Sequence, residues 1–217
     1  MSDDPETARQ ITELARDRRP LLVVDVDEVV LDFVDPFIRF LHGQGLSLLT
    51  DSFRIHGNIV KRDDGAAVDD AAVSALITAF FDVQGDWQTA AEGAVDALAS
   101  LSGQAEIVLL SAMPHRHRPI RRALLDLLGL PYPLLSTETA KGPAVRQLRG
   151  NTGRPVAFID DIPRNLASVG EAVPDAALFH LMSHAGLRLL VPPLPDGAVP
   201  LENWSEAGPK IAAALGL

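Results

Sequence analysis

The chain has 217 residues, of which 47% are hydrophobic and 22% are charged, so it is long and apolar enough to bury a core. Its formal net charge of −10 repels the phosphate backbone of nucleic acids, and we expect no nucleic-acid partner. The absence of cysteine excludes disulfides, thiolate zinc sites and cysteine nucleophiles. No signal peptide or apolar run of membrane-span length is visible, so we expect a cytoplasmic protein with no membrane partner.

An N-terminal helix and a first strand are predicted at the start of the chain. Residues 5–18 have an amphipathic pattern, and Pro20 ends this helix. The run LLVVDVDEVV follows from residue 21, and its first four residues are apolar. A continuous apolar run is typical of a strand buried on both faces, which predicts a parallel sheet between two layers of helices.

Residues 33–86 break the alternation of strand and helix and predict a mostly helical insert. A first helix is expected to begin at Asp35 and Pro36, and a second helix covers residues 68–82. Glycines punctuate residues 43–67 between them, so we expect irregular structure there.

Beyond the insert, helices and strands alternate again. Predicted helices cover residues 88–101, 117–129, 142–150, 163–172 and 206–216. Predicted strands cover residues 105–111, 155–161, 176–182 and 187–191. This pattern indicates the α/β class, with a doubly wound parallel sheet and right-handed crossovers. The predicted domains are a core of residues 1–32 and 87–217 and a small helical insert of residues 33–86.

Acidic pairs follow two of the predicted strands directly. Asp25 and Asp27 end the first strand, and Asp160 and Asp161 end the strand after the VAFI run. Ligands of open α/β sheets bind beyond the carboxyl ends of the strands, where the two pairs meet if their strands are neighbours. Close carboxylates repel by about 4 kcal/mol per pair at an effective dielectric of about 20, so the site needs a cation, and Mg²⁺ fits an all-oxygen ligand set. Taken singly, each pair also fits a solvated strand end or, for Asp161, a helix N-cap.

Two further side chains point to phosphate chemistry. Ser111 ends the predicted strand 105–111, where its hydroxyl and the following helix start suit a phosphoryl oxygen, although a plain N-cap is the alternative. Lys141 is one of three lysines against sixteen arginines, and it opens a predicted helix where a cation opposes the helix dipole. A buried anionic partner would justify this placement, and a solvated surface lysine is the alternative.

These motifs, in this order, resemble those of the haloacid dehalogenase (HAD) superfamily of phosphotransferases. VVDVDEVVLD (residues 23–32) is similar to the first family motif, and VLLS ending at Ser111 is similar to the second. Lys141 stands for the third motif and FIDD (residues 158–161) for the fourth. Glu28 departs from the pattern, because many members have Gly there. The resemblance covers about residues 20–32 and 100–175.

The resemblance implies an Mg²⁺-dependent phosphatase that cleaves a small phosphorylated metabolite through an aspartyl-phosphate. Asp25 would be the nucleophile, and Asp27 would protonate the leaving oxygen and then activate water. Lys141 and Ser111 would neutralise and orient the phosphoryl group. The insert resembles the C1-type helical cap of the family, which closes over the site and selects substrate.

The same resemblance implies a ligand set for the metal ion. Asp25, the main-chain carbonyl of Asp27, and Asp160 with or without Asp161 would hold Mg²⁺. The doubled-aspartate form of the fourth motif leaves both of its carboxylates as candidates for direct contact.

Other functions share parts of this pattern. A phosphomutase or another HAD phosphotransferase would use the same fold, whereas a phosphonatase would need a reactive cap lysine, and the only one is Lys61. A receiver-type signalling domain also combines acids, a hydroxyl and a lysine, but places its acidic pair and its phosphoacceptor on different strands. A non-catalytic phosphate-binding protein on this fold would be expected to lack one of the catalytic groups, and none is missing.

Substrate contacts are predicted with less detail. Residues 114–122 (PHRHRPIRR) form a basic patch that suits a second anionic group, but we favour a solvated helix face with Arg121 and Arg122 pointing away. Trp204 and the C-terminal helix are expected to serve packing. Candidate substrate contacts in the insert are Arg54, His56, Asn58 and Lys61.

Overall fold

A six-stranded parallel sheet forms the centre of the computed structural model, which describes residues 3–15 and 17–217. The strand order is β5-β4-β1-β6-β7-β8, and every neighbouring pair runs parallel. The strands are β1 (Leu21–Val24), β4 (Glu106–Ser111), β5 (Leu134–Ser136), β6 (Val156–Asp160), β7 (Ala177–Leu181) and β8 (Val199–Leu201). This is the predicted doubly wound α/β fold.

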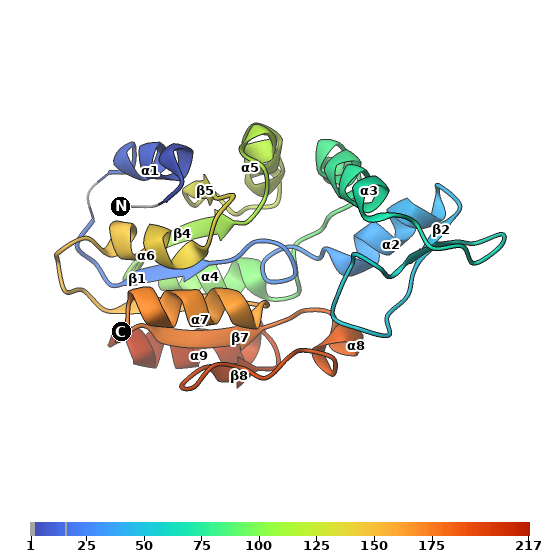
Figure 1. Cartoon of the computed structure of the whole chain (residues 1–217). Coiled ribbons are helices and arrows are strands. Elements are labelled where there is room, and N and C mark those ends of the chain that lie inside the picture. The colour runs from blue at the N-terminus through green and yellow to red at the C-terminus, as the bar shows by residue number, and fades with distance from the viewer. Residues whose placement is uncertain (1–2, 16) are drawn as a thin grey trace.

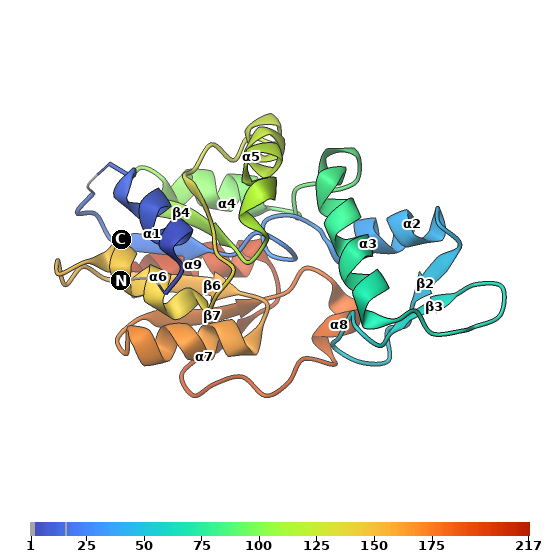
Figure 2. The same cartoon turned by 45° about the horizontal axis from the view of Figure 1, so that its top comes forward.

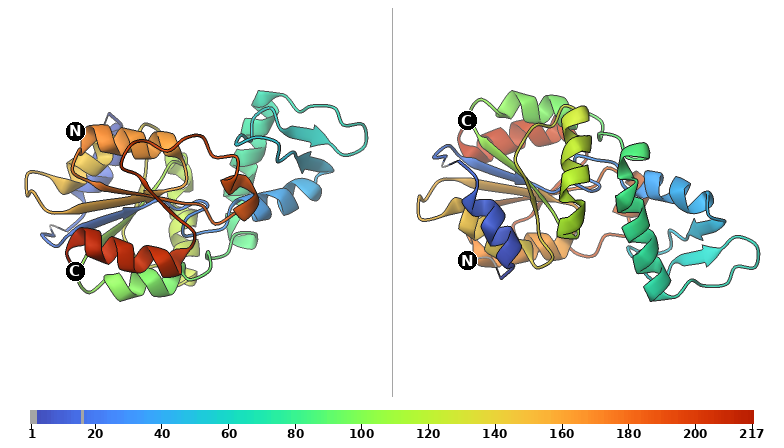
Figure 3. Two further views of the ribbon diagram at one scale, coloured as in Figure 1. Left: turned by 90° about the horizontal axis from the view of Figure 1, so that it is seen from below. Right: turned by 90° about the horizontal axis from the view of Figure 1, so that it is seen from above.

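Helices cover both faces of the sheet, as the apolar strand runs predicted (Figure 1, Figure 3). One layer contains α1 (Pro5–Thr12), α6 (Lys141–Arg149) and α7 (Pro163–Ala172), and the other contains α4 (Ala94–Leu101) and α9 (Trp204–Leu215), with α5 (Arg118–Leu127) beside β4 and β5. Side chains alternate along β1: Leu21 and Val23 join one buried cluster, and Leu22 and Val24 join the other. Both faces of β1 are therefore core. Trp204 is buried in the second of these clusters, so its predicted packing role is confirmed.

The predicted insert region lies at the end of the sheet opposite the two chain termini (Figure 1, Figure 2). Its elements are α2 (Val34–His42), β2 (Leu46–Leu48), β3 (Ile59–Lys61), α3 (Asp70–Asp82) and the short 3-10 helix η1 (Gln84–Asp86). Both expected helices are present. The antiparallel β2–β3 hairpin was not expected, because its two strands have only three residues each and lie inside the glycine-punctuated stretch.

The N-terminal helix is shorter than predicted. It ends at Thr12, and residue 16 of the predicted span lies outside the described residues. Inside α1, Thr7 and Gln10 are buried, and the Thr7 hydroxyl donates to the carbonyl of Ser136 at 2.8 Å. In the rest of the predicted span, residues 13–15, 17 and 18 include no fully buried side chain, and a helix without a packed face is marginal in water.

The strand predicted over residues 187–191 is wrong. The four-residue helix α8 (Ala185–Arg188) overlaps the start of this span, and the His184 ring accepts the backbone N–H of Leu187 at 3.0 Å. Leu189 is 88% exposed, so this apolar run does not enter the sheet. The edge strand β8 forms further along the chain and contains Pro200, which only an edge position tolerates.

None of the helices in the described part of the chain combines the length and the apolar composition that crossing a bilayer requires.

Candidate active site

The carboxyl ends of β1 and β6 bring three acids together. The strands pair in register with Val24 beside Ile159, and the Asp25 amide donates to the Ile159 carbonyl at 2.9 Å. Asp25, Asp160 and Asp161 each place a carboxylate oxygen within 4.8 Å of the others, and all three residues are buried. The predicted meeting of the two acidic motifs is therefore present.

Lys141 lies inside this acidic cluster and is only 1% exposed, so the alternative of a solvated lysine is wrong. Its Nζ contacts Asp25 Oδ1 and lies 2.7 Å from Asp160 Oδ2. Helix α6 begins at Lys141 and packs closely on α7. The approach is so close that a Cβ atom at Gly142 would lie 2.1 Å from the Ser168 carbonyl oxygen. Gly142 thus permits the close approach that carries Lys141 to the strand ends.

Burial changes the protonation behaviour of the cluster. It raises the pKa of Asp25 to about 7, with Lys141 opposing and the charge of Asp160 adding to the shift. Burial and the neighbouring charges of Asp25 and Asp160 also raise the pKa of Asp161. Burial alone would lower the pKa of Lys141, but the carboxylates of Asp160 and Asp25 outweigh it and raise that pKa. One ammonium cannot neutralise three buried acids, and an all-oxygen donor set of this kind fits Mg²⁺.

The two aspartates of the second acidic pair differ in their surroundings. Asp160 Oδ1 accepts from the Ile162 amide at 2.8 Å and from the Asn165 side chain at 3.0 Å, so both of its oxygens are engaged. Asp161 does not cap the helix at Pro163 as considered above. Within residues 3–15 and 17–217, no hydrogen bond reaches the Asp161 carboxylate, which lines the adjoining cavity.

Asp27 belongs to a second, separate set of contacts. The guanidinium of Arg121 donates to both carboxylate oxygens of Asp27, at 2.9 and 3.0 Å, and the Gln88 side chain donates to Asp27 Oδ1 at 3.0 Å. The Ser111 hydroxyl donates to Asp27 Oδ2 at 3.4 Å. Ser111 caps no helix and is fully buried beside Asp27, whereas the next residue, Ala112, lines the cavity.

The expectation that Arg121 points into solvent is wrong. Arg121 is fully buried, and it also contacts Gln84 Oε1, donates to Gln88 Oε1 at 3.2 Å and lies over the Phe81 ring at 5.5 Å. Its position on α5 gives the reason, because it shares the buried face with Leu124 and Leu125. In the sequence, Arg121 stands three and four residues before Leu124 and Leu125, and this helical spacing could have indicated that it is buried.

The rest of the basic patch is also engaged within the chain. Arg122 points away from the cavity as expected, but it is half-buried rather than solvated and donates to the carbonyls of Leu130 and Tyr132. His115 contacts the Asp4 carboxylate at 3.0 Å. These contacts stabilise the packing around α1 and α5, and no residue of 114–122 lines the cavity, so the structure gives the patch no role as a second anion site.

Glu28 turns the chain from β1 toward α2. Its φ of 65° lies in the left-handed region, which explains why a glycine suits this position. The carboxylate compensates by accepting the amides of Phe33 at 3.1 Å and Val34 at 2.7 Å, which start α2, and it contacts the Ser183 hydroxyl. Burial raises the pKa of Glu28.

A cavity of about 790 Å³ opens beside the acidic cluster, between the strand ends and residues 33–86. Asp25, Asp27, Asp161 and Lys141 line its floor. Of the candidate contacts in the insert, Arg54 and His56 line the cavity, whereas Asn58 and Lys61 do not.

Comparison with known proteins bears on the fold. No protein-family model matches the sequence, and no curated protein matches it. Among solved structures, a haloacid dehalogenase-like family hydrolase from Xanthomonas campestris aligns over 94% of this chain and 95% of its own, with a TM-score of 0.56 and 12% identity. A haloacid dehalogenase-like protein of unknown function from Agrobacterium tumefaciens aligns over 92% and 100%, with a TM-score of 0.61 and 14% identity. The chain has the haloacid dehalogenase fold.

A third structure with the HAD fold is the D,D-heptose 1,7-bisphosphate phosphatase from B. bronchiseptica, which was solved with magnesium and phosphate. It aligns over 89% of this chain and 98% of its own, with a TM-score of 0.53 and 15% identity. These matches confirm the fold that the resemblance of the four motifs implied. At such identities they establish the HAD fold, and the chemistry is argued from the residues themselves.

Proposed function

We propose that the chain is an Mg²⁺-dependent phosphatase that hydrolyses a phosphate monoester of a small molecule. The observation that carries this proposal is Lys141, a buried ammonium between Asp25 and Asp160 at the carboxyl edge of the sheet. A buried charge cluster of this kind is costly to the fold, and it suits a site that binds a cation and an anion together.

The nucleophile in this proposal is Asp25. One of its oxygens attacks the phosphorus, the P–O bond to the alcohol breaks, and the phosphoryl group is carried as an acyl phosphate. Asp27 gives its proton to the departing oxygen, then takes a proton from the water that attacks the acyl phosphate, releasing inorganic phosphate. Lys141 neutralises charge on the transferring group. The Arg121 ion pair holds the Asp27 carboxyl group in one orientation, which suits both proton transfers.

The metal ion would be held by Asp25, the main-chain carbonyl of Asp27, and Asp161. When bound, Mg²⁺ supplies positive charge that balances the acids and the phosphoryl oxygens. We assign direct contact to Asp161 because its carboxylate lines the cavity, whereas Asp160 is held by Lys141, Ile162 and Asn165. Asp160 would then act by fixing Lys141 and the start of α7.

In the same proposal, residues 33–86 act as the cap that closes over the site. The phosphonatase alternative gains no support, because Lys61 is exposed and does not line the cavity. No observation favours a mutase over a hydrolase.

The test is a phosphate-release assay over a panel of phosphate monoesters, with and without Mg²⁺. We expect Mg²⁺-dependent turnover that Asp25→Asn abolishes without unfolding the protein, because the amide keeps the shape and removes the nucleophile. An Asp25→Asn variant that keeps a tenth of the wild-type rate would show that another group attacks the phosphorus.

A further inference from the structure

The wall of the cavity opposite the acidic cluster is apolar. Half-buried side chains from three separate elements line it: Leu48 on β2, Phe53 on the loop that follows, and Ile77 on α3. Phe33 and Phe37 also line the cavity, and their rings stack at 5.5 Å. Apolar side chains that line a cavity open to water are typical of a pocket that binds a ligand with apolar surface. We therefore take this wall as the contact surface for an apolar part of the ligand.

The apolar wall is held in place by hydrogen bonds within the loop of residues 49–58. The Leu49 amide donates to the Asn58 carbonyl at 2.7 Å, and the Asn58 side chain donates to the Ser52 hydroxyl at 2.6 Å and to the Arg54 carbonyl at 2.7 Å. The His56 ring contacts the Ser74 hydroxyl of α3 at 3.0 Å. Asn58, which does not reach the cavity, therefore shapes its wall, so the wall is preformed.

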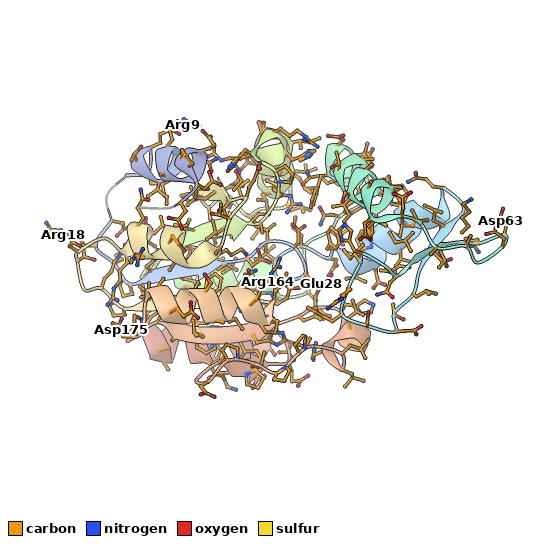
Figure 4. All side chains as sticks on the ribbon, in the orientation of Figure 1. Arg9, Arg18, Glu28, Asp63, Arg164 and Asp175 are labelled. Carbon is orange, nitrogen blue, oxygen red and sulfur yellow. The ribbon has the colours of Figure 1, made fainter. Side chains whose placement is uncertain are left out.

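Two arginines stand at the rim of the same cavity. Arg54 belongs to the insert loop, and Arg164 lies at the end of α7 nearest the insert (Figure 4). Both are exposed, and neither guanidinium has a hydrogen-bond or ion-pair partner in the described ranges 3–15 and 17–217. In a chain of net charge −10, these cations attract an anionic ligand to an otherwise acidic site.

We propose that the substrate is a phosphate monoester whose organic part is bulky and apolar; this rests on the proposed phosphatase function. The phosphoryl group occupies the floor with Asp25 and Lys141, and the organic part packs against Phe53 and Ile77. The volume of about 790 Å³ lies in the range of pockets that enclose organic ligands of roughly 300–1,000 Å³. A two- or three-carbon polar ester would leave the apolar wall in contact with water.

Binding tests the proposal without requiring turnover. Methylphosphonate and 2-phenylethylphosphonate carry the same head group and cannot be hydrolysed as esters. With Mg²⁺ present, calorimetry should show that 2-phenylethylphosphonate binds at least about tenfold more tightly, since each methylene in an apolar pocket contributes roughly that much. Equal dissociation constants, or tighter binding of methylphosphonate, would overturn the proposal.

Turnover separates this proposal from the proposed function. With glycerol phosphate and 2-phenylethyl phosphate, both alkyl esters, kcat/KM should favour the phenylethyl ester by at least about tenfold. Mg²⁺-dependent hydrolysis of both esters at equal kcat/KM would support the phosphatase and overturn the substrate class. Selective binding of 2-phenylethylphosphonate with no phosphate release from any ester would support an apolar ligand and overturn the phosphatase function.

Variants assign the selectivity to the wall. Phe53→Ala and Ile77→Ala, on different elements, should each lower the phenylethyl-to-glycerol ratio of kcat/KM by about tenfold, mainly through KM for the phenylethyl ester. Leu127→Ala is the matched control, because Leu127 is an 82% exposed apolar residue on α5 outside the cavity, and both rates should stay unchanged. Folding of each variant is checked by its melting temperature. An unchanged ratio in both folded wall variants would refute the role of the wall.

Discussion

Two buried cations serve the two acids of the first motif in different ways. Lys141 contacts Asp25 and Asp160 as a compact point charge, and the cluster stays open to the cavity. Arg121 places its planar fork on Asp27, and its remaining donors contact Gln84 and Gln88. A lysine leaves its carboxylates free to accept a further cation, whereas an arginine fixes the orientation of one carboxylate. The Lys141 cluster can therefore accept a further cation, whereas the Asp27 carboxylate is held in one orientation.

The largest effect is expected from Lys141→Met. It leaves the buried carboxylates of Asp25 and Asp160 without their cation. We therefore expect a loss of about 3–5 kcal/mol in the free energy of unfolding without Mg²⁺. Activity should fall by about 10³-fold, because a central electrostatic group is removed. Lys210→Met is the control, since Lys210 is exposed and pairs with Glu206 on the helix surface. Near-normal activity of Lys141→Met would contradict the shared-cation arrangement.

Arg121→Met is expected to act through Asp27. The acid loses its fixed orientation, so turnover of an alkyl phosphate should fall by about 10²-fold, within the 10²–10⁴-fold range expected for Asp27→Asn. For p-nitrophenyl phosphate, whose leaving group needs no proton, the first step should be nearly spared and a burst of nitrophenolate should precede slow turnover.

Arg121→Lys tests whether charge or orientation matters. Partial recovery of the alkyl rate would assign part of the effect to charge, and no recovery would assign it to the planar fork. Equal losses for alkyl and aryl substrates with no burst, in both Arg121→Met and Asp27→Asn, would contradict the assignment of Asp27 as acid and base.

Mg²⁺ should stabilise the protein by about 2.7 kcal/mol at a hundredfold excess over its Kd. Asp161→Asn should remove most of this gain, because Asp161 offers the free carboxylate on the cavity side. Asp175→Asn, an exposed acid that pairs with Arg149, is the control. The measurement is the melting temperature over a Mg²⁺ titration, and one that does not respond to millimolar Mg²⁺ would count against the metal site.

A smaller effect follows from the pKa of Asp25, which burial raises to about 7 from an ordinary 3.8. Between about pH 4 and pH 7 the folded chain keeps a proton on Asp25 that the unfolded chain has released. Without Mg²⁺, this group therefore makes the free energy of unfolding decrease as pH rises through that window. The difference between wild type and Asp25→Asn isolates it in urea titrations from pH 4 to 8, and a difference independent of pH would contradict the shift.

The local parts of this molecule could be predicted from the sequence. The apolar runs before Asp25 and Asp160 determine buried parallel strands by themselves, and chain order then places their acids at one edge. Lys141 could be singled out because a lysine at a helix start is unfavourable without an anion.

Other parts depend on contacts between distant segments and could not be predicted. Strand β5 has three residues and is held by pairing with β4, so its own sequence gives little signal. Arg121 was expected at the surface because its partners, Asp27, Gln84 and Gln88, lie far away in sequence. The difference between Asp160 and Asp161 depends on Asn165 and the Ile162 amide, which no strand pattern reveals.

The two chain connections of the insert have a mechanical consequence. The outgoing connection passes through Glu28, whose carboxylate ties the start of α2 to Ser183. The returning connection carries Gln88, which bonds Asp27 and the carbonyl of Asp32 at 3.0 Å each. Gln88 thus links both chain connections of the insert to Asp27. If Asp27 is the proposed acid and base, a displacement of the insert that carried Gln88 with it would remove a hydrogen bond that orients the catalytic carboxyl group.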